Sequence, residues 1–371
     1  MNASPLRIGI VGGGSVGEHF LRDFGPVPAY DLVGIVTRAP ARQRELTERY
    51  NVRSYGSLAD LLHEEGTPDV VCVVNANHDH REATLEALAA GAHVYLEKPM
   101  APTLEECREI VEAEAVAPGS VQVGFEYIHG SMTARLKDLI GQGQFGEVQW
   151  ISMLDSRGHW WSQSPHGNLE EIWKLDRKRG GGLIFHCGIH QLDLIRHYAG
   201  PIKTIQAFRP GKNPLSFYPD DVPANVTLMI TTERGVTVNF QVMHDRAATW
   251  YREKGYRPDY VHAPGHAFNI SVIGTQGSCE MRIYDEELHL FHLDAARKEN
   301  EFIRTETFKP NPHDKSHHDM TGLLHRFLTS VAAGHGAVDP VAGAYETMRA
   351  ASVAEAAIQR PGECLSVDDL T

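Results

Sequence analysis

Length, composition and charge point to a soluble globular protein with more than one domain. The chain has 371 residues, 42% hydrophobic and 22% charged, and no apolar run approaches the roughly 20 residues of a membrane-spanning helix. A single core rarely serves such a length, so we expect two domains, and the net charge of −13 argues against nucleic acid or an anionic membrane as partner.

The first element is a short buried strand followed by a glycine-rich turn. Leu6 to Val11 is a nearly continuous apolar run, as in a strand of a parallel sheet. The G-x-G-x-x-G spacing that follows permits a sharp turn, close approach of the backbone to a pyrophosphate, and tight packing of the next helix. That helix directs its free N–H groups at the phosphates. We therefore predict a dinucleotide site, although glycine turns alone are common, with contacts from Gly12, Gly14, Ser15, Val16 and Gly17.

The second strand, Asp31 to Val36, ends without the acidic residue that usually binds the ribose 2′-hydroxyl of NAD. Thr37, Arg38 and Arg42 stand there instead and offer a hydroxyl and two cations to a 2′-phosphate, without repulsion by a carboxylate. The alternative is a solvated basic loop. We expect NAD(P) as cofactor, with NADP slightly favoured over NAD.

Polar residues follow the next buried strand, Asp69 to Val74. Because ligands bind at the carboxyl ends of strands in an open α/β sheet, we expect this cluster to face the cofactor through Asn75, Asn77 and His80. His93 to Leu96 is another strand, and Thr103-x-x-Glu106 predicts a capping box at the start of the following helix.

The alternation of strands and helices indicates a doubly wound domain that binds a dinucleotide, over residues 1–125. The remainder, 126–371, has a period of two, with a hairpin around Glu233-Arg234-Gly235 and a second one around Gly274 to Gly277. The predicted fold class is therefore α/β, a doubly wound Rossmann domain plus a C-terminal α+β domain with a large, mainly antiparallel open sheet.

One face of this second sheet should be covered by helices and the other free. We expect the free face to form the interface of a homodimer or homotetramer, the alternative being a solvated face. Helices at about Ser316–Ala333 and Pro340–Arg360 close the chain, with Asp339 as N-cap and Pro340 at the first helical position. One of these C-terminal helices could pack on the first domain.

The chain resembles the glucose-fructose oxidoreductase, inositol dehydrogenase and MocA family of NAD(P)-dependent sugar oxidoreductases. The resemblance rests on the glycine motif, on Asn77 with His80, on Glu97-Lys98-Pro99, and on the segment Gly180 to Asp193, GGGLIFHCGIHQLD. The pairing of the last two motifs is much more specific than the glycines alone.

The resemblance implies that Lys98 reaches both the nicotinamide ribose and the substrate and that His190 serves as acid or base. Lysine changes its pKa readily when desolvated and histidine titrates near neutral pH, so either could move a hydroxyl proton. It also implies that Pro99 is cis. Glu97 and Lys98 complete the expected cofactor contacts, and Glu126, Tyr127 and Asp193 join Lys98 as expected substrate contacts.

His186 departs from the family pattern, which commonly has Asp four residues before the histidine. His186 and His190 would share one face if the helix begins early enough. His186 then relays a proton or contacts substrate. A metal site with Glu126 or Asp155 is the weaker alternative, and no metal is predicted.

Two further stretches are rich in histidine and tryptophan. Within 155–174, His159, Trp160 and Trp161 are predicted substrate contacts, the alternative being a loop anchored by buried tryptophans. His313, His317 and His318, with Asp314 and Asp319, resemble metal ligands in composition, but a solvated helix start is the preferred interpretation.

The five cysteines are scattered and form no C-x-x-C pair, so we expect reduced thiols and neither a disulfide framework nor a structural zinc site. The N-terminus enters a strand without a signal peptide, which predicts a cytoplasmic protein.

The predicted function is reversible oxidation of a secondary hydroxyl of a sugar, cyclitol or related polyol. A redox-neutral lyase or glycoside-cleaving enzyme that recycles a retained cofactor is the alternative, and a non-catalytic nucleotide sensor is a further one. Net cofactor turnover distinguishes the first two.

Overall fold

The fold consists of two units, and the computed structural model describes residues 4–158, 180–211, 222–246, 267–294, 299–308 and 318–370. The first unit comprises Met1–Phe125 and Met320–Met348, and the second comprises Glu126–Asp319 and Arg349–Thr371. Residues 320–348, which lie within the predicted second range, thus group with the first.

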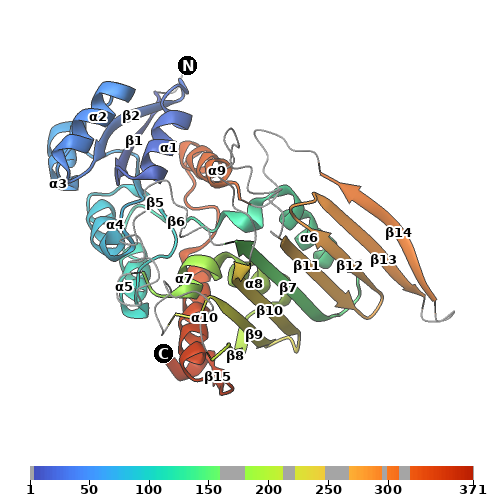
Figure 1. The fold of residues 1–371 in the computed structure, drawn as a ribbon. Helices are drawn as coiled ribbons and strands as arrows, with labels where there is room; N and C mark the ends of the chain where they lie inside the picture. The colour runs from blue at the N-terminus through green and yellow to red at the C-terminus, as the bar shows by residue number, and fades with distance from the viewer. Residues whose placement is uncertain are drawn as a thin grey trace, which may run out of the picture. The chain divides into compact units, whose positions relative to one another are not determined.

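The first unit contains a six-stranded parallel sheet in the order β3-β2-β1-β4-β5-β6 (Figure 1). The order reverses at β1 and β4, which is the topology of a doubly wound nucleotide-binding sheet and confirms the predicted class. Its strands are almost wholly buried, as their continuous apolar runs predict. The strands are β1 (Leu6–Val11), β2 (Tyr30–Val36), β3 (Ser54–Tyr55), β4 (Val70–Val73), β5 (His93–Leu96) and β6 (Val121–Val123).

Helices cover this parallel sheet, and one of them comes from the C-terminal part of the chain. Leu323, Leu324, Phe327 and Leu328 of α9 join the core formed around β1 and α1. The predicted capping box of Thr103 and Glu106 is present at the start of α5. The helices are α1 (Ser15–Phe24), α2 (Pro40–Tyr50), α3 (Leu58–Glu65), α4 (His80–Ala89), α5 (Leu104–Glu114) and α9 (Met320–Ala332), with the 3-10 turn η1 (Asn77–Asp79) before α4.

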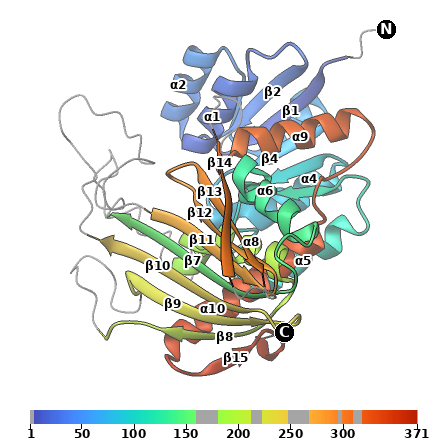
Figure 2. The same ribbon diagram turned by 90° about the vertical axis from the view of Figure 1, so that its right-hand side faces the viewer.

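The second unit contains a nine-stranded sheet in the order β14-β13-β12-β11-β7-β10-β9-β8-β15 (Figure 2). Of the strand pairs described in this nine-stranded sheet, only β10–β7 is parallel, so the predicted, mainly antiparallel sheet is confirmed. The strands are β7 (Val148–Gly158), β8 (Ile202–Phe208), β9 (Asn225–Thr232), β10 (Thr237–Arg246), β11 (Ala267–Gly274), β12 (Gly277–Arg282), β13 (Glu287–Asp294), β14 (Glu299–Thr307) and β15 (Cys364–Ser366).

Burial alternates along the strands, so one face is covered and the other is open. Val226, Leu228 and Ile230 of β9 are fully enclosed, whereas the residues between them are partly exposed. Helices α6 and α8 are joined where the Tyr198 hydroxyl donates to the carbonyl of Thr133. The helical elements are η2 (Glu126–His129), α6 (Ser131–Gly141), α7 (Leu183–Cys187), α8 (Ile189–Ala199) and η6 (Val367–Leu370), and α10 (Val341–Gln359) runs from the first unit into the second.

One row of the open face is apolar. Trp150, Ile273, Phe291 and Phe302 follow one another across β7, β11, β13 and β14 with Ser278 of β12 between Ile273 and Phe291. We call these four residues the apolar row. Three of them, Trp150, Ile273 and Phe302, are exposed.

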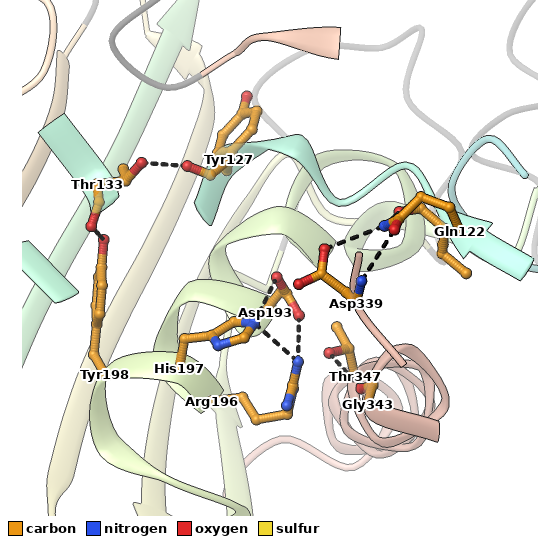
Figure 3. Close-up of polar contacts among 11 residues, drawn as sticks. Gln122, Tyr127, Thr133, Asp193, Arg196, His197, Tyr198, Asp339, Gly343 and Thr347 are labelled. Atoms are coloured by element: carbon orange, nitrogen blue, oxygen red, sulfur yellow. Dashed lines mark hydrogen bonds and ion pairs between the residues drawn. The ribbon is translucent and has the colours of Figure 1, made fainter. Parts of the chain in front are cut away.

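The last long helix begins later than predicted. Helix α10 starts at Val341, so Pro340 precedes it and Asp339 is not its N-cap. Asp339 is engaged elsewhere, because its N–H donates to Gln122 Oε1 and its carboxylate accepts from Gln122 Nε2 (Figure 3). Helix α9 begins at Met320, and the predicted start at Ser316 lies outside the described residues.

All five cysteines are free thiols, as predicted, and only Cys364 is exposed. Among the residues that the structure describes, no helix is both long enough and apolar enough to cross a membrane.

Candidate functional site

The glycine motif forms a turn between β1 and α1. Gly12 has a φ of 128°, and a Cβ there would lie 2.6 Å from the backbone of Val74, so only glycine fits. A Cβ on Gly17 would meet the Gly12 carbonyl oxygen at 1.9 Å, which accounts for the third glycine by close packing. By contrast, a Cβ on Gly14 would have no neighbour within 4 Å.

The open side of this turn fits a dinucleotide. Gly14 and Ser15 are exposed at the N-terminus of α1, where the free N–H groups of a ten-residue helix favour an anion. Val16 is the next residue in the same turn. The residues present therefore match the pyrophosphate-binding role predicted for them.

The basic residues after β2 are paired with carboxylates from other segments. Arg38 Nη2 lies 2.7 Å from Asp79 Oδ2, and Arg42 bonds both the Gly13 carbonyl oxygen and Glu18 Oε2. The bond from Arg42 lowers the pKa of Glu18 and keeps it ionised. The expectation that no carboxylate lies here is therefore wrong, because Asp79 and Glu18 come from the segment after β4 and from α1.

His80 joins the polar segment after β4 to the segment after β5. Its Nδ1 lies 2.8 Å from the carbonyl oxygen of Pro99, and its Nε2 lies 3.3 Å from that of Asn75. Burial lowers the pKa of His80 to about 4, so the ring is neutral near pH 7. Asn77 is buried in the same turn, η1. His80 therefore holds two cofactor-side segments together.

Glu97 and Lys98 follow the buried end of β5. The Lys98–Pro99 peptide bond is cis, as the resemblance implies. Glu97 is part-buried as a residue, yet its Oε2 is enclosed and has no hydrogen-bond partner in the described part of the chain. Burial raises the pKa of Glu97 to about 7, against the opposing charge of Lys98. Lys98 itself is partly exposed.

In the second unit, the histidine motif is divided between two helices. Gly188 ends α7 and precedes α8 with φ −120° and ψ −7°, so His186 and His190 do not lie on one continuous helix. The expectation that their spacing places them on one face of a helix is therefore wrong. Gly188 packs closely on Ile184 and Phe240, where a Cβ would be crowded.

The start of α7 is held by a buried carboxylate of α10. The Ile184 N–H donates to Glu355 Oε1 at 2.6 Å. Gly182 has a φ of 107°, and a Cβ there would lie 2.5 Å from the Glu355 carboxyl carbon. Gly182, the third glycine of the GGGLIFHCGIH segment, thus leaves space for the Glu355 carboxylate that binds the Ile184 N–H.

His190 is buried beside a carboxylate and an aromatic ring. Its Nε2 lies 3.7 Å from Glu126 Oε1, and its ring is parallel to that of Tyr127, at 4.1 Å between centroids. His318 Nδ1 lies 3.1 Å from the same Glu126 oxygen. The sequence predicts Glu126 as a neighbour of the histidine pair but gives no sign that His318 joins it, because His318 is far away in the sequence and no spacing links it to the others.

The residues after His190 are fixed by polar bonds of their own. The buried Asp193 accepts from Arg196 at 3.0 Å and lies 3.6 Å from His197, both on the same helix (Figure 3). The side chain of Gln191 donates to the buried Asp155 of β7 at 2.6 Å. The Gln191–Asp155 bond joins α8, and with it the backbone of His190, to the sheet.

Backbone contacts also fix Tyr127. Its carbonyl oxygen accepts from the Thr133 hydroxyl, and the Thr133 carbonyl oxygen accepts from Tyr198 (Figure 3). The ring stacked on His190 is thereby tied to α6 and α8.

Several predicted residues lie outside the described part of the chain, namely His159, Trp160, Trp161, His313, Asp314 and His317. His318 and Asp319 are described, and the expected solvated helix start is wrong for Asp319, which is buried. The side chain of His318 is partly exposed and pairs with Glu126. Within the described ranges, no group of three or more His, Cys, Asp or Glu side chains could hold a metal ion.

Comparisons with curated proteins reveal dehydrogenases of sugars and cyclitols. Inositol 2-dehydrogenase of Salmonella typhimurium is 25% identical over 67% of this chain and 72% of its own. D-glucoside 3-dehydrogenase of Escherichia coli is 28% identical over 56% of this chain and 58% of its own. The chain spans less than two thirds of the length of several curated relatives that it matches.

A solved structure shares the whole fold. Levoglucosan dehydrogenase in complex with NADH and levoglucosan has a TM-score of 0.78 at 20% identity, covering 98% of this chain and 99% of its own. Two family models also match: the oxidoreductase family with an NAD-binding Rossmann fold over residues 6–125, and the GFO/IDH/MocA C-terminal domain over 133–280. Together they cover more than half of the chain, which therefore belongs to the GFO/IDH/MocA family of oxidoreductases.

Proposed function

We propose that the protein is an NAD(P)-dependent dehydrogenase that interconverts a secondary hydroxyl and a ketone on a sugar, cyclitol or related polyol. The observation that carries this proposal is the buried His190 imidazole beside the Glu126 carboxylate, in a member of a family of oxidoreductases. A buried imidazole with an acidic neighbour is suited to accept and return a hydroxyl proton near neutral pH.

The chain's own residues bind the cofactor and move the proton. Gly12, Gly14, Ser15 and the N-terminus of α1 hold the pyrophosphate, and Lys98 binds the nicotinamide ribose and the substrate hydroxyl. His190 takes the hydroxyl proton during oxidation and returns it during reduction. When bound, the nicotinamide supplies the hydride-accepting and hydride-donating chemistry.

The substrate class follows from what the named relatives share. Inositol, glucosides and levoglucosan all carry secondary hydroxyls on a six-membered ring, and the relatives that match are named for acting on them. We propose a ring polyol of this kind, bound by Lys98, Glu126, Tyr127, His186 and Asp193. His186 takes part in proton transfer as a neutral imidazole.

Both NAD and NADP are proposed as cofactors, with NADP bound at least as well. The Arg38 side chain is 79% exposed, and such a surface ion pair contributes only about 0–1 kcal/mol. Arg38 can therefore favourably leave Asp79 and bind a doubly charged 2′-phosphate instead. Thr37 lies beside Gly13 and offers a hydroxyl to the same phosphate.

A homodimer or homotetramer through the open face of the nine-stranded sheet is also proposed. Exposed large apolar side chains are unusual on a solvated sheet face, and the apolar row places several together. We expect wild-type protein to elute as an oligomer in size-exclusion chromatography with light scattering, and Ile273→Glu to elute as a monomer. Val116→Glu, at another exposed apolar residue, is the control. A monomeric wild type would refute this interface.

The proposed activity is tested by identifying any nucleotide that copurifies with the protein and by screening ring polyols for reduction of NAD and NADP at the absorbance band of the reduced nicotinamide. We expect net turnover with at least one ring polyol, lowered by about 10² to 10⁴ after Lys98→Ala. Lys137→Ala, an exposed lysine of α6, is the matched control. Absence of turnover with every polyol would refute the proposal.

A further inference from the structure

Two imidazoles from distant segments meet at one buried carboxylate oxygen. Glu126 begins η2, His190 lies in the first turn of α8, and His318 directly precedes Asp319 and α9. Glu126 Oε1 lies 3.7 Å from His190 Nε2 and 3.1 Å from His318 Nδ1. The two rings themselves are 6.1 Å apart between centroids, so the carboxylate is the group that connects them.

Two members of this group are enclosed and the third is open to solvent. The side chains of His190 and Glu126 are 6% and 2% exposed, whereas that of His318 is 40% exposed. A proton taken up by His190 is therefore enclosed, while one on His318 can pass to water. The 3.7 Å separation is an ion-pair distance, and catalytic contacts of this kind shorten when substrate binds.

We propose that Glu126 passes protons between His190 and His318, so that His318 is the exit to solvent. This inference rests on the proposed function, in which oxidation of the hydroxyl delivers a proton to His190 and a hydride to the nicotinamide. The N–H bond at His190 Nε2 breaks and a proton binds Glu126 Oε1. Glu126 then protonates Nδ1 of His318, whose Nε2 releases a proton to water. His190, which received the hydroxyl proton at Nε2, and Glu126 are then back in their starting states. His318 is left as the Nδ1–H tautomer, and a ring flip or proton exchange with water restores its Nε2–H tautomer.

The groups packed around His190 and His318 include one carboxylate, that of Glu126, in direct contact with both rings. The groups that face His190 in the described chain are Glu126 and Tyr127 from η2 and His318. Tyr127 also packs on the His318 ring, at 5.4 Å between centroids, and on the apolar Phe268 of β11. On β7, Asp155 accepts from Gln191, the residue after His190. An enclosed carboxylate beside two imidazoles favours their protonated forms.

Imidazole NMR titrations test the connection without any need for activity. Glu126→Gln keeps the shape of the side chain but removes its charge, so we expect the pKa of both His190 and His318 to fall by about 1 to 3 units. Glu64→Gln, an exposed glutamate of α3, should change neither. Glu126→Asp, which keeps the charge, provides a second variant if the first is unstable. Unchanged titrations of both histidines would overturn the relay.

Kinetics test the direction of proton flow. His318→Gln should lower kcat about tenfold or more with little change in KM, and added imidazole buffer should restore it, because a soluble base replaces the exit group. His63→Gln on α3 is the matched control. A kcat for His318→Gln equal to that control would also overturn the relay. Failure of the proposed function would be distinct, because wild-type protein would then oxidise no polyol.

Discussion

Two buried histidines, one in each unit, have opposite surroundings. His80 lies between two backbone carbonyl oxygens, after β4 in the first unit. His190 lies beside the carboxylate of Glu126 and against the ring of Tyr127 in the second. Burial is the larger effect on His80 and lowers its pKa to about 4, although the bonds to the carbonyl oxygens act in the opposite direction.

The difference shows which buried histidine can work as an acid or base. His80 stays neutral across the physiological range and acts as a link between Asn75 and Pro99. A histidine that faces a carboxylate can carry a proton at neutral pH, since the negative charge offsets the loss of solvation. Substitution of the first should therefore affect stability, and substitution of the second should affect turnover.

The largest effect is expected for the proton-transfer residues. His190→Ala and Lys98→Ala should each lower turnover by about 10² to 10⁴, because a positioned proton-transfer group contributes that much. Their melting temperatures should stay close to that of wild type. Steady-state kinetics with the best polyol, alongside thermal unfolding, provides the measurement. Near-normal turnover in either variant would remove that residue from the chemistry.

The second prediction concerns His80 and pH. Its pKa is lowered from 6.5 to about 4 in the folded protein, so the unfolded chain binds a proton first as the pH falls. The contribution of the neutral His80 ring to the free energy of unfolding is therefore complete above pH 6.5. This contribution falls by about 3 kcal/mol as the pH decreases from 6.5 to 4. Urea unfolding of wild type and His80→Gln across this range should show a steeper acid loss for wild type. His63→Gln should behave as wild type, and parallel curves for His80→Gln and wild type would contradict the assignment.

Glu97 offers a third test, with the opposite sign. Burial raises its pKa from 4.5 to about 7, so the folded protein loses stability as the pH rises from 4.5 to 7. Glu97→Gln should remove this loss and stabilise the protein by about 3 kcal/mol at pH 8, but not at pH 4.5. Glu105→Gln, exposed on α5, is the control. Equal unfolding free energies for wild type and Glu97→Gln at pH 8 would count against the enclosed carboxyl.

The smallest effect is expected for cofactor choice. Arg38→Ala should weaken NADP binding about tenfold, or ~1.4 kcal/mol, while NAD binding changes little. Isothermal titration of both nucleotides, with Arg22→Ala as an exposed arginine control, measures the difference. A preference for NAD that survives the substitution would show that Arg38 contacts no phosphate.

The first unit could be predicted from sequence because its signals are local. Gly12 to Gly17 lie within one turn, and Glu97, Lys98 and Pro99 are consecutive, so motif and geometry coincide. The carboxylates near Arg38 and Arg42 were not predictable, because Asp79 and Glu18 reach them from other segments. Spacing along one segment carries no information on such neighbours.

In the second unit, the sheet, the motif around His190 and a nearby carboxylate such as Glu126 were predicted, but the approach of His318 was not. Alternating residues such as Val226, Leu228 and Ile230 specify strands on their own. The contact among Glu126, His190 and His318 depends on how three separate segments pack. The spacing of hydrophobic residues along one segment does not predict such packing. Likewise, the break at Gly188 arises from its close packing on Ile184 and Phe240, and the i, i+4 spacing could not reveal it.

The ends of the nine-stranded sheet bear on how copies of this chain can associate. At one end, β15 has only three residues, Cys364–Ser366, and turns directly into η6. At the other, β14 is irregularly paired near Phe291 and carries Glu301, Arg304 and Glu306, the last of them held by Arg135 of α6. Short, bulged or charged edge strands resist the backbone pairing that leads to fibrils. Such a protein can present an extensive open sheet at high cellular concentration with little tendency to aggregate.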